Sequence, residues 1–263
     1  MVKIKNLQLS VIVAIMMMIG FISACDKKKN NNSSGSSTTV IEASNISIEQ
    51  GSDASVTQVK IVAFDEIELE IASAPYQNRG FKITLPASVN NQYLETVADM
   101  FEGIEVSDPN AKCVAVPYVI AFNNNYPIGM FMLGEETNTQ TISNTTYTCW
   151  IYVDKDVSVK GSATGSDNWS EPGKTHQDSY TESANIICKK GWNIIYTNEI
   201  EKETYNSATD IYIGEYQITY SNQKPSNNLK WHGYIFGSYS KNMPKDKIHS
   251  KFGKNLKLKN ILK

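Results

Sequence analysis

Between residues 55 and 240 the chain is built from short segments in which apolar and polar side chains alternate. Glu alternates with Ile and Leu in residues 66–71, and residues 81–85 alternate again before Pro86. Side chains along a β-strand point in turn to opposite faces of a sheet, so this period of two predicts strands with one buried face. The Glu side chains of residues 66–71 are expected to face water; a carboxylate cluster for a cation is the alternative.

More strands are expected further along the chain. Residues 112–122 are nearly all apolar, which indicates a strand buried on both faces, with an edge or bulge at Pro117 because proline donates no backbone hydrogen bond. Residues 123–127 read as a turn into the strand 128–133, which predicts a hairpin. Further strands are predicted around residues 147–153, 157–159, 184–196, 212–220 and 229–239.

One helix is expected near residues 90–102, where the period of the apolar residues changes. These residues recur at helical spacing, with acidic residues on the opposite side, and Gly103 would end the helix. The apolar stripe consists of Tyr93, Leu94, Val97, Met100 and Phe101.

Together these patterns predict a mainly β fold, an antiparallel β-sandwich of immunoglobulin-like or related type spanning about residues 55–240, with one short helix. Apolar residues make up 41% of the chain, enough for a substantial core. Two smaller β domains that meet near residue 140 are the alternative.

The N-terminus has the layout of a secretory signal peptide over residues 1–24. A short basic start precedes an apolar run from about residue 7 to residue 24, and residues 26–30 are polar again. An uncleaved membrane anchor is the alternative, since the run is close to the ~20 residues that a membrane helix needs.

Residues 21–25 read Phe-Ile-Ser-Ala-Cys, and the small residues directly before Cys25 resemble the lipobox of bacterial lipoproteins, the site of signal peptidase II. The resemblance implies cleavage before Cys25, transfer of diacylglycerol to its sulfur and acylation of the new amine. It thus implies a lipid-anchored protein of the bacterial cell envelope, periplasmic or surface-exposed. In some bacteria an Asp at the place of Asp26 retains a lipoprotein at the inner membrane, so the leaflet stays open.

Residues 25–54 are expected to form a disordered tether. Lys, Asn, Ser, Thr and Gly dominate its composition, which offers too little apolar surface to offset the entropy of the chain. Order is expected from about Val56, and the tether would give the β domain reach from the membrane.

Charge is distributed unevenly along the chain. Residues 30–240 hold 12 Lys and Arg against 25 Asp and Glu, whereas the tail 241–263 holds eight Lys and one Asp. An acidic body argues against nucleic acid as a partner. In the tail, Ile248, Phe252 and Leu256 recur every four residues, so a short amphipathic helix is one option. A solvated tail, docking on the protein's own acidic face and docking on an anionic surface are the others.

Residues 161–178 are rich in Gly, Ser and Asp and read as a long loop, which in compact domains is often functional. Trp169 lies within it. A large aromatic residue on a polar loop is a candidate for stacking on a sugar or a protein partner; the alternative is that Trp169 folds back onto the sheet.

The body contains three cysteines besides Cys25. At most one disulfide can form among them, and it would leave one thiol unpaired. A Cys149–Cys188 disulfide is predicted, and Cys113 is then the thiol. Catalysis by Cys188 with His232 is a weaker alternative.

No motif for a metal, a cofactor or hydrolytic catalysis is recognised. The chain lacks H-E-x-x-H, G-x-S-x-G and a P-loop, and its three His have no second ligand at metal spacing. A calcium site around Asp154, Asp156 and Asp167 is the alternative, although the EF-hand pattern is missing. We therefore expect no cofactor, no resident metal and no catalytic residue.

The strand–turn–Trp segment 184–196 resembles β-rich domains of uncharacterised bacterial lipoproteins, and that similarity brings no catalytic residue. The function expected is a non-enzymatic binding or envelope-contact module, held at the membrane by its lipid, with a protein or polysaccharide ligand. A carbohydrate-binding or carbohydrate-active envelope protein that uses Trp169 and nearby Tyr is the second hypothesis. An enzyme of unrecognised type is the third.

Overall fold

The computed structural model describes residues 39–63, 69–171, 174–225 and 228–236. The predicted signal peptide, Cys25 and the tail 241–263 lie outside these residues. Strands dominate the described part, and its α-helix is a single turn, α1 (Val97–Met100). The mainly β fold with one short helix is therefore confirmed. Within the described ranges, no helix is long and apolar enough to cross a membrane.

The strands vary greatly in length, from two residues to sixteen. In chain order they are β1 (Val40–Ala43), β2 (Ser47–Gln50), β3 (Gln58–Val62), β4 (Glu70–Pro75), β5 (Phe81–Thr84), β6 (Glu95–Thr96), β7 (Glu105–Val106), β8 (Lys112–Val116), β9 (Val119–Asn123), β10 (Tyr126–Asn138), β11 (Ile142–Val153), β12 (Val157–Glu171), β13 (Lys174–Cys188), β14 (Gly191–Asn206), β15 (Ile211–Ser221) and β16 (Lys230–Ile235).

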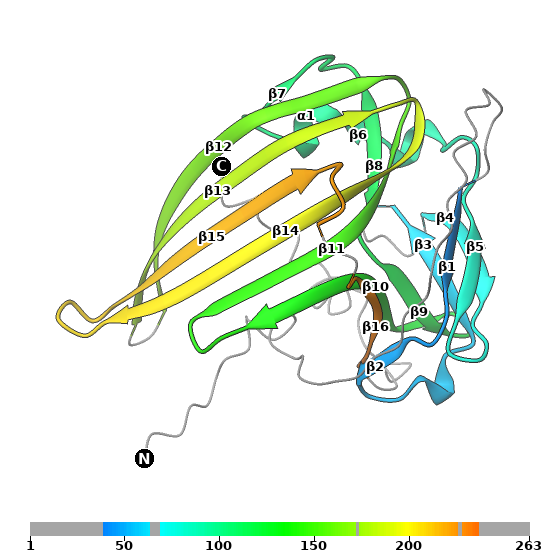
Figure 1. Cartoon of the computed structure of the whole chain (residues 1–263), viewed down its shortest axis with the longest axis horizontal. Helices are drawn as coiled ribbons and strands as arrows, with labels where there is room; N and C mark the ends of the chain where they lie inside the picture. The colour runs from blue at the N-terminus through cyan, green and yellow to red at the C-terminus, as the bar shows by residue number, and fades with distance from the viewer. Residues whose placement is uncertain (1–38, 64–68, 172–173, 226–227, 237–263) are drawn as a thin grey trace.

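Ten strands of a 14-stranded sheet follow the order β4-β3-β9-β10-β11-β14-β15-β13-β12-β7. The other four lie off this path: β16 pairs with β10 and β2, and β8 pairs with β11 and β6. β1 and β5 form a separate two-stranded sheet. Figure 1 shows the long strands β11 to β15 side by side on a common curve, with β1, β3, β4 and β5 at the other end of the molecule. Pairing is antiparallel except between β13 and β15 and between β16 and β2. The sheet is continuous across residue 140, where β10 and β11 form a hairpin, so the chain does not divide there into two β domains.

The first core lies between the two-stranded sheet and the large sheet, which gives this end a sandwich-like construction. Phe131 is fully buried there and stacks on Tyr76 with ring centroids 5.1 Å apart. Trp150 stacks on Trp231 of β16 at 5.9 Å. Each large side chain buried in this way stabilises the fold by roughly 1.5–3 kcal/mol.

The second core lies beneath α1. Val97 and Phe101 pack on the apolar end of the long strands, among them Val159 and Ile186. The predicted helix over residues 90–102 is wrong in length: Asn91–Tyr93 form a 3-10 turn, and β6 pairs with β8 before α1 begins. Residues 95 and 96 pair with β8 as a strand and therefore cannot be helical, which limits α1 to one turn.

Two strands lie inside the segment predicted as a tether, and that prediction is wrong from residue 40 onward. β1 pairs with β5, and β2 pairs with β16. Ile41 and Ile46 are almost completely buried. Each strand has only four residues and its partner lies far away in the sequence, so local composition gave too little signal.

The predicted strand 112–122 is two strands. β8 ends before Pro117 and pairs with β11 and β6, whereas β9 begins after Tyr118 and pairs with β10 and β3. Proline cannot donate to the ladder, and the chain changes neighbours at this point. The predicted hairpin of 128–133 with the preceding strand is confirmed as β9–β10.

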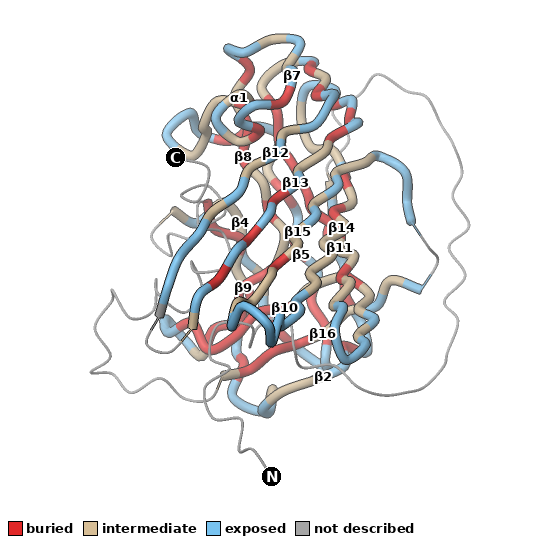
Figure 2. Tube along the Cα trace, turned by 90° about the vertical axis from the view of Figure 1, so that its left-hand side faces the viewer, coloured by how far each residue is buried: buried red, intermediate tan, exposed pale blue. Residues whose placement is uncertain are grey.

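The predicted long loop 161–178 is also wrong. β12 and β13 pair continuously from Val157 opposite Cys188 to Glu171 opposite Lys174. Figure 2 shows buried and exposed residues alternating along β13. Within residues 174–178 the buried positions of β13 are polar, His176 and Asp178, so no apolar alternation marks this part of the strand in the sequence.

Candidate functional site

One face of the long strands β10 to β15 carries the candidate site, and we call it the inner face because α1 packs against its apolar end. At that end lie the residues of the second core. Further along the same face, alternate positions carry aromatic and acidic side chains instead. The inner face is thus half core and half polar surface, because the strands extend beyond the part that α1 covers.

An aromatic ladder crosses four strands at the far end of the inner face. Strand register places Trp169 of β12 opposite His176 of β13, then Tyr212 of β15 and Tyr205 of β14. The ring centroids are 3.9, 5.2 and 4.9 Å apart in that order. The outermost rings are the most accessible: Trp169 is 36% and Tyr205 52% exposed. These distances are typical of stacked rings, so the ladder is a preformed aromatic surface.

Asp178 holds the ladder in place from the neighbouring row. Its carboxylate accepts hydrogen bonds from Trp169 Nε1 at 2.7 Å and from the Tyr180 hydroxyl at 3.1 Å. Asp178 is buried and lies opposite Gly214 of β15, where a side chain would collide with Asp178 Oδ1. The glycine therefore makes room for the carboxylate that orients Trp169.

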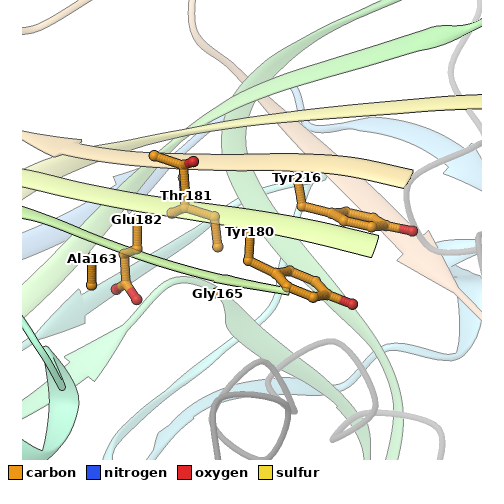
Figure 3. Close-up of a pocket in the computed structure, with 7 residues that line it drawn as sticks. Ala163, Gly165, Tyr180, Thr181, Glu182 and Tyr216 are labelled. Atoms are coloured by element: carbon orange, nitrogen blue, oxygen red, sulfur yellow. The ribbon is translucent and has the colours of Figure 1, made fainter. Parts of the chain in front are cut away.

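A second aromatic pair forms the next row. Tyr180 and Tyr216 stack at 5.1 Å, and burial raises the pKa of both hydroxyls, an effect that nearby Asp178 reinforces. A shallow pocket opens beside them, where Ala163 and Gly165 leave space next to Glu182 (Figure 3). The pocket thus lies at the border between the apolar and polar halves of the inner face.

Carboxylates gather on β14 and its neighbours. Glu199, Glu201 and Glu203 occupy successive inner-face positions of β14. Desolvation raises the pKa of Glu201, and the charges of Glu203, Glu199 and Asp178 raise it further. Burial likewise raises the pKa of Glu199, although its carboxylate accepts a 2.6 Å hydrogen bond from Tyr147. Repulsion among these groups favours any cation that comes to lie between them.

At the β10–β11 end of the face lie further polar groups. Glu136 is opposite Thr145, and Asn138 is opposite Ser143. Desolvation raises the pKa of Glu136, the hydrogen bond from Asn138 lowers it, and the charge of Glu49 raises it. The polar half of the inner face therefore extends from the aromatic ladder to the β10–β11 hairpin.

Trp169, predicted as a ligand contact on a loop, lies instead on a strand, at the end of the aromatic ladder. It is partly folded onto the sheet, since one ring face stacks on His176, and partly accessible. The other ladder members were missed, because they come from separate strands whose register the sequence does not state. Alternation of His176, Asp178 and Tyr180 along β13 was the one local signal.

The predicted disulfide does not form in this structure. Cys113, Cys149 and Cys188 are free and buried, all in the second core. Cys149 lies on β11 and Cys188 on β13, and in the sheet order β14 and β15 separate these strands. Burial raises the pKa of the Cys149 thiol to about 12 and that of Cys188 to about 11, so neither is a thiolate near neutral pH.

The residues weighed for a calcium site are not brought together. Asp154 accepts the backbone N–H of Lys112, and Asp156 binds Lys189. Asp167 lies eleven residues further along β12, roughly 35 Å away in an extended strand. Across the described ranges, no group of three or more His, Cys, Asp or Glu is placed to hold a metal ion. His232, weighed as a partner of Cys188, contacts Glu49 at 2.9 Å.

No protein-family model, no curated protein and no solved structure matches this chain.

Proposed function

We propose that this protein is a lipid-anchored, non-enzymatic binding module of the bacterial cell envelope and that the polar inner face is its binding surface. The aromatic ladder is the observation that carries the proposal. Four rings from four strands form one surface, and a buried carboxylate orients the outermost of them. Binding sites commonly combine aromatic surface with a few fixed polar groups, as this face does. The lipobox-like residues before Cys25 support the anchor.

Carbohydrate binding is the more specific candidate, and the accessible ends of the ladder favour it. Trp169 and Tyr205 offer ring surface on which the apolar face of a sugar stacks. Asp167 and Glu203 lie in the adjacent row and would accept hydrogen bonds from sugar hydroxyls. An acidic surface disfavours anionic polysaccharides, so neutral or amino-sugar polymers are the expected class.

The test is a panel of neutral, amino-sugar and anionic polysaccharides measured by affinity electrophoresis and titration calorimetry. We expect a neutral or amino-sugar polymer to bind, and Trp169→Ala to weaken binding about tenfold, which corresponds to ~1.4 kcal/mol of lost stacking. Tyr126→Ala is the matched control, because Tyr126 is an exposed aromatic residue in the β9–β10 turn, away from the inner face. Equal binding by Trp169→Ala and the unaltered protein, or no binding to any polymer, would remove the carbohydrate assignment.

A further inference from the structure

Three buried polar atoms on the inner face have no hydrogen-bond partner within the described part of the chain. They are Asn138 Oδ1, Ser143 Oγ and Thr145 Oγ1, at the β10–β11 end of the face. Thr145 is only 7% exposed. Buried polar atoms almost always have a partner in folded proteins, so three neighbouring exceptions indicate a place where an occupant supplies one. An amide oxygen only accepts hydrogen bonds, so that occupant must donate.

Carboxylates surround these atoms. Glu136 and Glu199 lie on either side of Thr145, and Glu201 lies opposite Ser143. Among the described residues of the inner face and of the adjoining strands β2 and β16, eight carboxylates stand against the lysines Lys174 and Lys230. The eight are Glu49, Glu136, Asp167, Asp178, Glu182, Glu199, Glu201 and Glu203. Ionised carboxylates accept and do not donate, and their shared negative charge favours a cationic donor over a neutral one; a lysine ammonium, with three donors and no acceptor, fits.

The ladder already holds one ammonium group. Lys174 Nζ lies 5.0 Å from the centroid of the Tyr212 ring, within the range of cation–π attraction. The inner face thus offers lysine both types of partner, carboxylates and aromatic faces.

We infer that the Lys-rich segment 241–263 of the same chain docks on the acidic inner face. Its eight Lys against one Asp complement the excess of carboxylates. The described chain ends close to this face: β16 pairs with β10, and the Phe236 N–H donates to Ile128 O at 2.8 Å. Phe236 packs beside Met130 and Tyr234, which are on the inner-face side of their strands. The 27 residues that follow span up to roughly 90 Å when extended, and sixteen-residue β14 is about 50 Å long, so the tail reaches the whole face.

The consequence of docking rests on the proposed function, because a docked tail regulates ligand binding only if the inner face is the binding surface. A tail docked on the inner face competes with an external ligand for the carboxylates and the ladder. Because the contacts are ionic and partly exposed, salt weakens docking. The local concentration of a tethered segment is high, on the order of millimolar, so modest intrinsic affinity is enough to keep the face occupied.

The first test maps carbodiimide cross-links in the full-length chain with Cys25→Ser, which removes the acylated residue. Carbodiimide joins lysine amines to carboxylates in direct contact. At low salt we expect tail lysines to link to Glu136, Glu199, Glu201 or Glu203, and these links to be lost in 0.5 M salt, a concentration at which the screening length is on the order of 4 Å. Links confined to carboxylates elsewhere on the molecule would overturn the inference. A mixture of isotope-labelled and unlabelled protein identifies the occupant, since mixed-label links would mean that the tail of a second copy docks instead.

The second test follows release of the tail by trypsin, which cleaves after lysine. The double variant Glu201→Gln/Glu203→Gln removes two inner-face charges, and we expect several-fold faster cleavage within residues 241–263 at low salt. Glu102→Gln/Glu105→Gln is the matched control, since it removes two charges near α1 and β7, away from the polar half. Equal cleavage rates in both variants and the unaltered chain would contradict docking on this face.

The polysaccharide panel separates this inference from the proposed function. Tail cross-links without polysaccharide binding would support docking and count against carbohydrate as the ligand. Polysaccharide binding that depends on Trp169, with no tail cross-links to the face, would support the ligand and overturn the inference.

Discussion

Asp178 shows how single residues build the binding face. This buried carboxylate takes hydrogen bonds from Trp169 and Tyr180, and it fits only because Gly214 lies opposite. Hydrogen bonds to charged groups contribute roughly 1.5–3 kcal/mol each, so the carboxylate offsets the cost of its own burial. Glu201 is in the opposite situation, because desolvation and the neighbouring carboxylates Glu203 and Glu199 raise its pKa.

Glu201→Gln is therefore expected to stabilise the protein at neutral pH in about 0.5 M salt, where the proposed docking of the tail is lost and no lysine offsets the charge of Glu201. Folding raises the pKa of this carboxyl above its ordinary value of 4.5, so the folded protein holds the proton more tightly than the unfolded chain. The penalty is absent below pH 4.5 and grows as the pH rises through the folded pKa. The variant should unfold at higher denaturant concentration at pH 7, by about 0.2–1 kcal/mol, and the gain should shrink at pH 4.5. A gain that is the same at both pH values would argue against charge repulsion as its source.

At the scale of elements, β15 packs between β13 and β14 because Gly214 leaves room for Asp178 between the large rings of Tyr212 and Tyr216. It runs parallel to β13 and antiparallel to β14, with aromatic residues on either side of Gly214. The second core depends on α1 in a similar way, since one helical turn covers the apolar end of several long strands. Both arrangements tolerate little change in volume, because protein interiors are close-packed.

Gly214→Ala tests the packing of β15. The added methyl group would overlap Asp178 Oδ1 and lie 2.7 Å from Tyr216 Cε2, so both side chains must move. We expect a loss of about 1–3 kcal/mol in the free energy of unfolding, as is typical of overpacking, together with weaker ligand binding. Gln217→Ala, on the exposed face of the same strand, is the control. An unchanged denaturation midpoint in Gly214→Ala would show that Asp178 and Tyr216 can move aside without loss of stability.

Thiol labelling tests the second core and the cysteine assignment together. Because Cys113, Cys149 and Cys188 are free and buried, native protein should react slowly with an alkylating reagent. After unfolding without reductant, intact mass should rise by three alkyl groups in the Cys25→Ser chain. A rise of one group would instead indicate a disulfide between two of the three cysteines.

At the scale of the whole molecule, the long strands β11 to β15 lie side by side on a common curve (Figure 1), and the polar half of the inner face runs across them beyond α1. A surface of that extent suits an extended ligand, such as a polymer chain or a basic segment, better than a small molecule. The proposed lipid anchor would hold this surface near a membrane, where polymers of the envelope are within reach. Protease treatment of intact and lysed cells would decide between a surface and a periplasmic location.

Cys25→Ser tests the anchor. Acyl chains bind a membrane through ~0.8 kcal/mol per buried CH₂, and serine has no sulfur to acylate. We expect the unaltered protein to be cleaved before Cys25 and to carry the mass of its acyl chains. Cys25→Ser should stay uncleaved and unacylated, and its apolar run 7–24 should then hold it at the membrane in place of the lipid. Replacing Ser23 by Ala, which keeps a small residue before the cysteine, should leave the membrane fraction unchanged. Membrane retention of a processed Cys25→Ser protein would rule out the lipid as its anchor.

Most strands were predictable because alternation is a local property. Residues 81–85, 128–133 and 212–220 were expected as strands and form β5, part of β10 and β15. Strands were not predicted where the segment is short or its buried residues are polar. β1 and β2 have four residues each, and the buried positions near the Lys174 end of β13 are His176, Asp178 and Tyr180. In those places strand pairing with distant segments outweighed local composition.

The sequence alone determined the mainly β class and the opposite charges of body and tail, because each depends on residue type or short-range order. The aromatic ladder, the cluster of carboxylates and the separation of Cys149 from Cys188 were decided only by tertiary structure. Trp169, His176, Tyr212 and Tyr205 come from four strands, and only the register of those strands aligns them. Register depends on cooperative packing and hydrogen bonding across the whole sheet, which no single segment encodes.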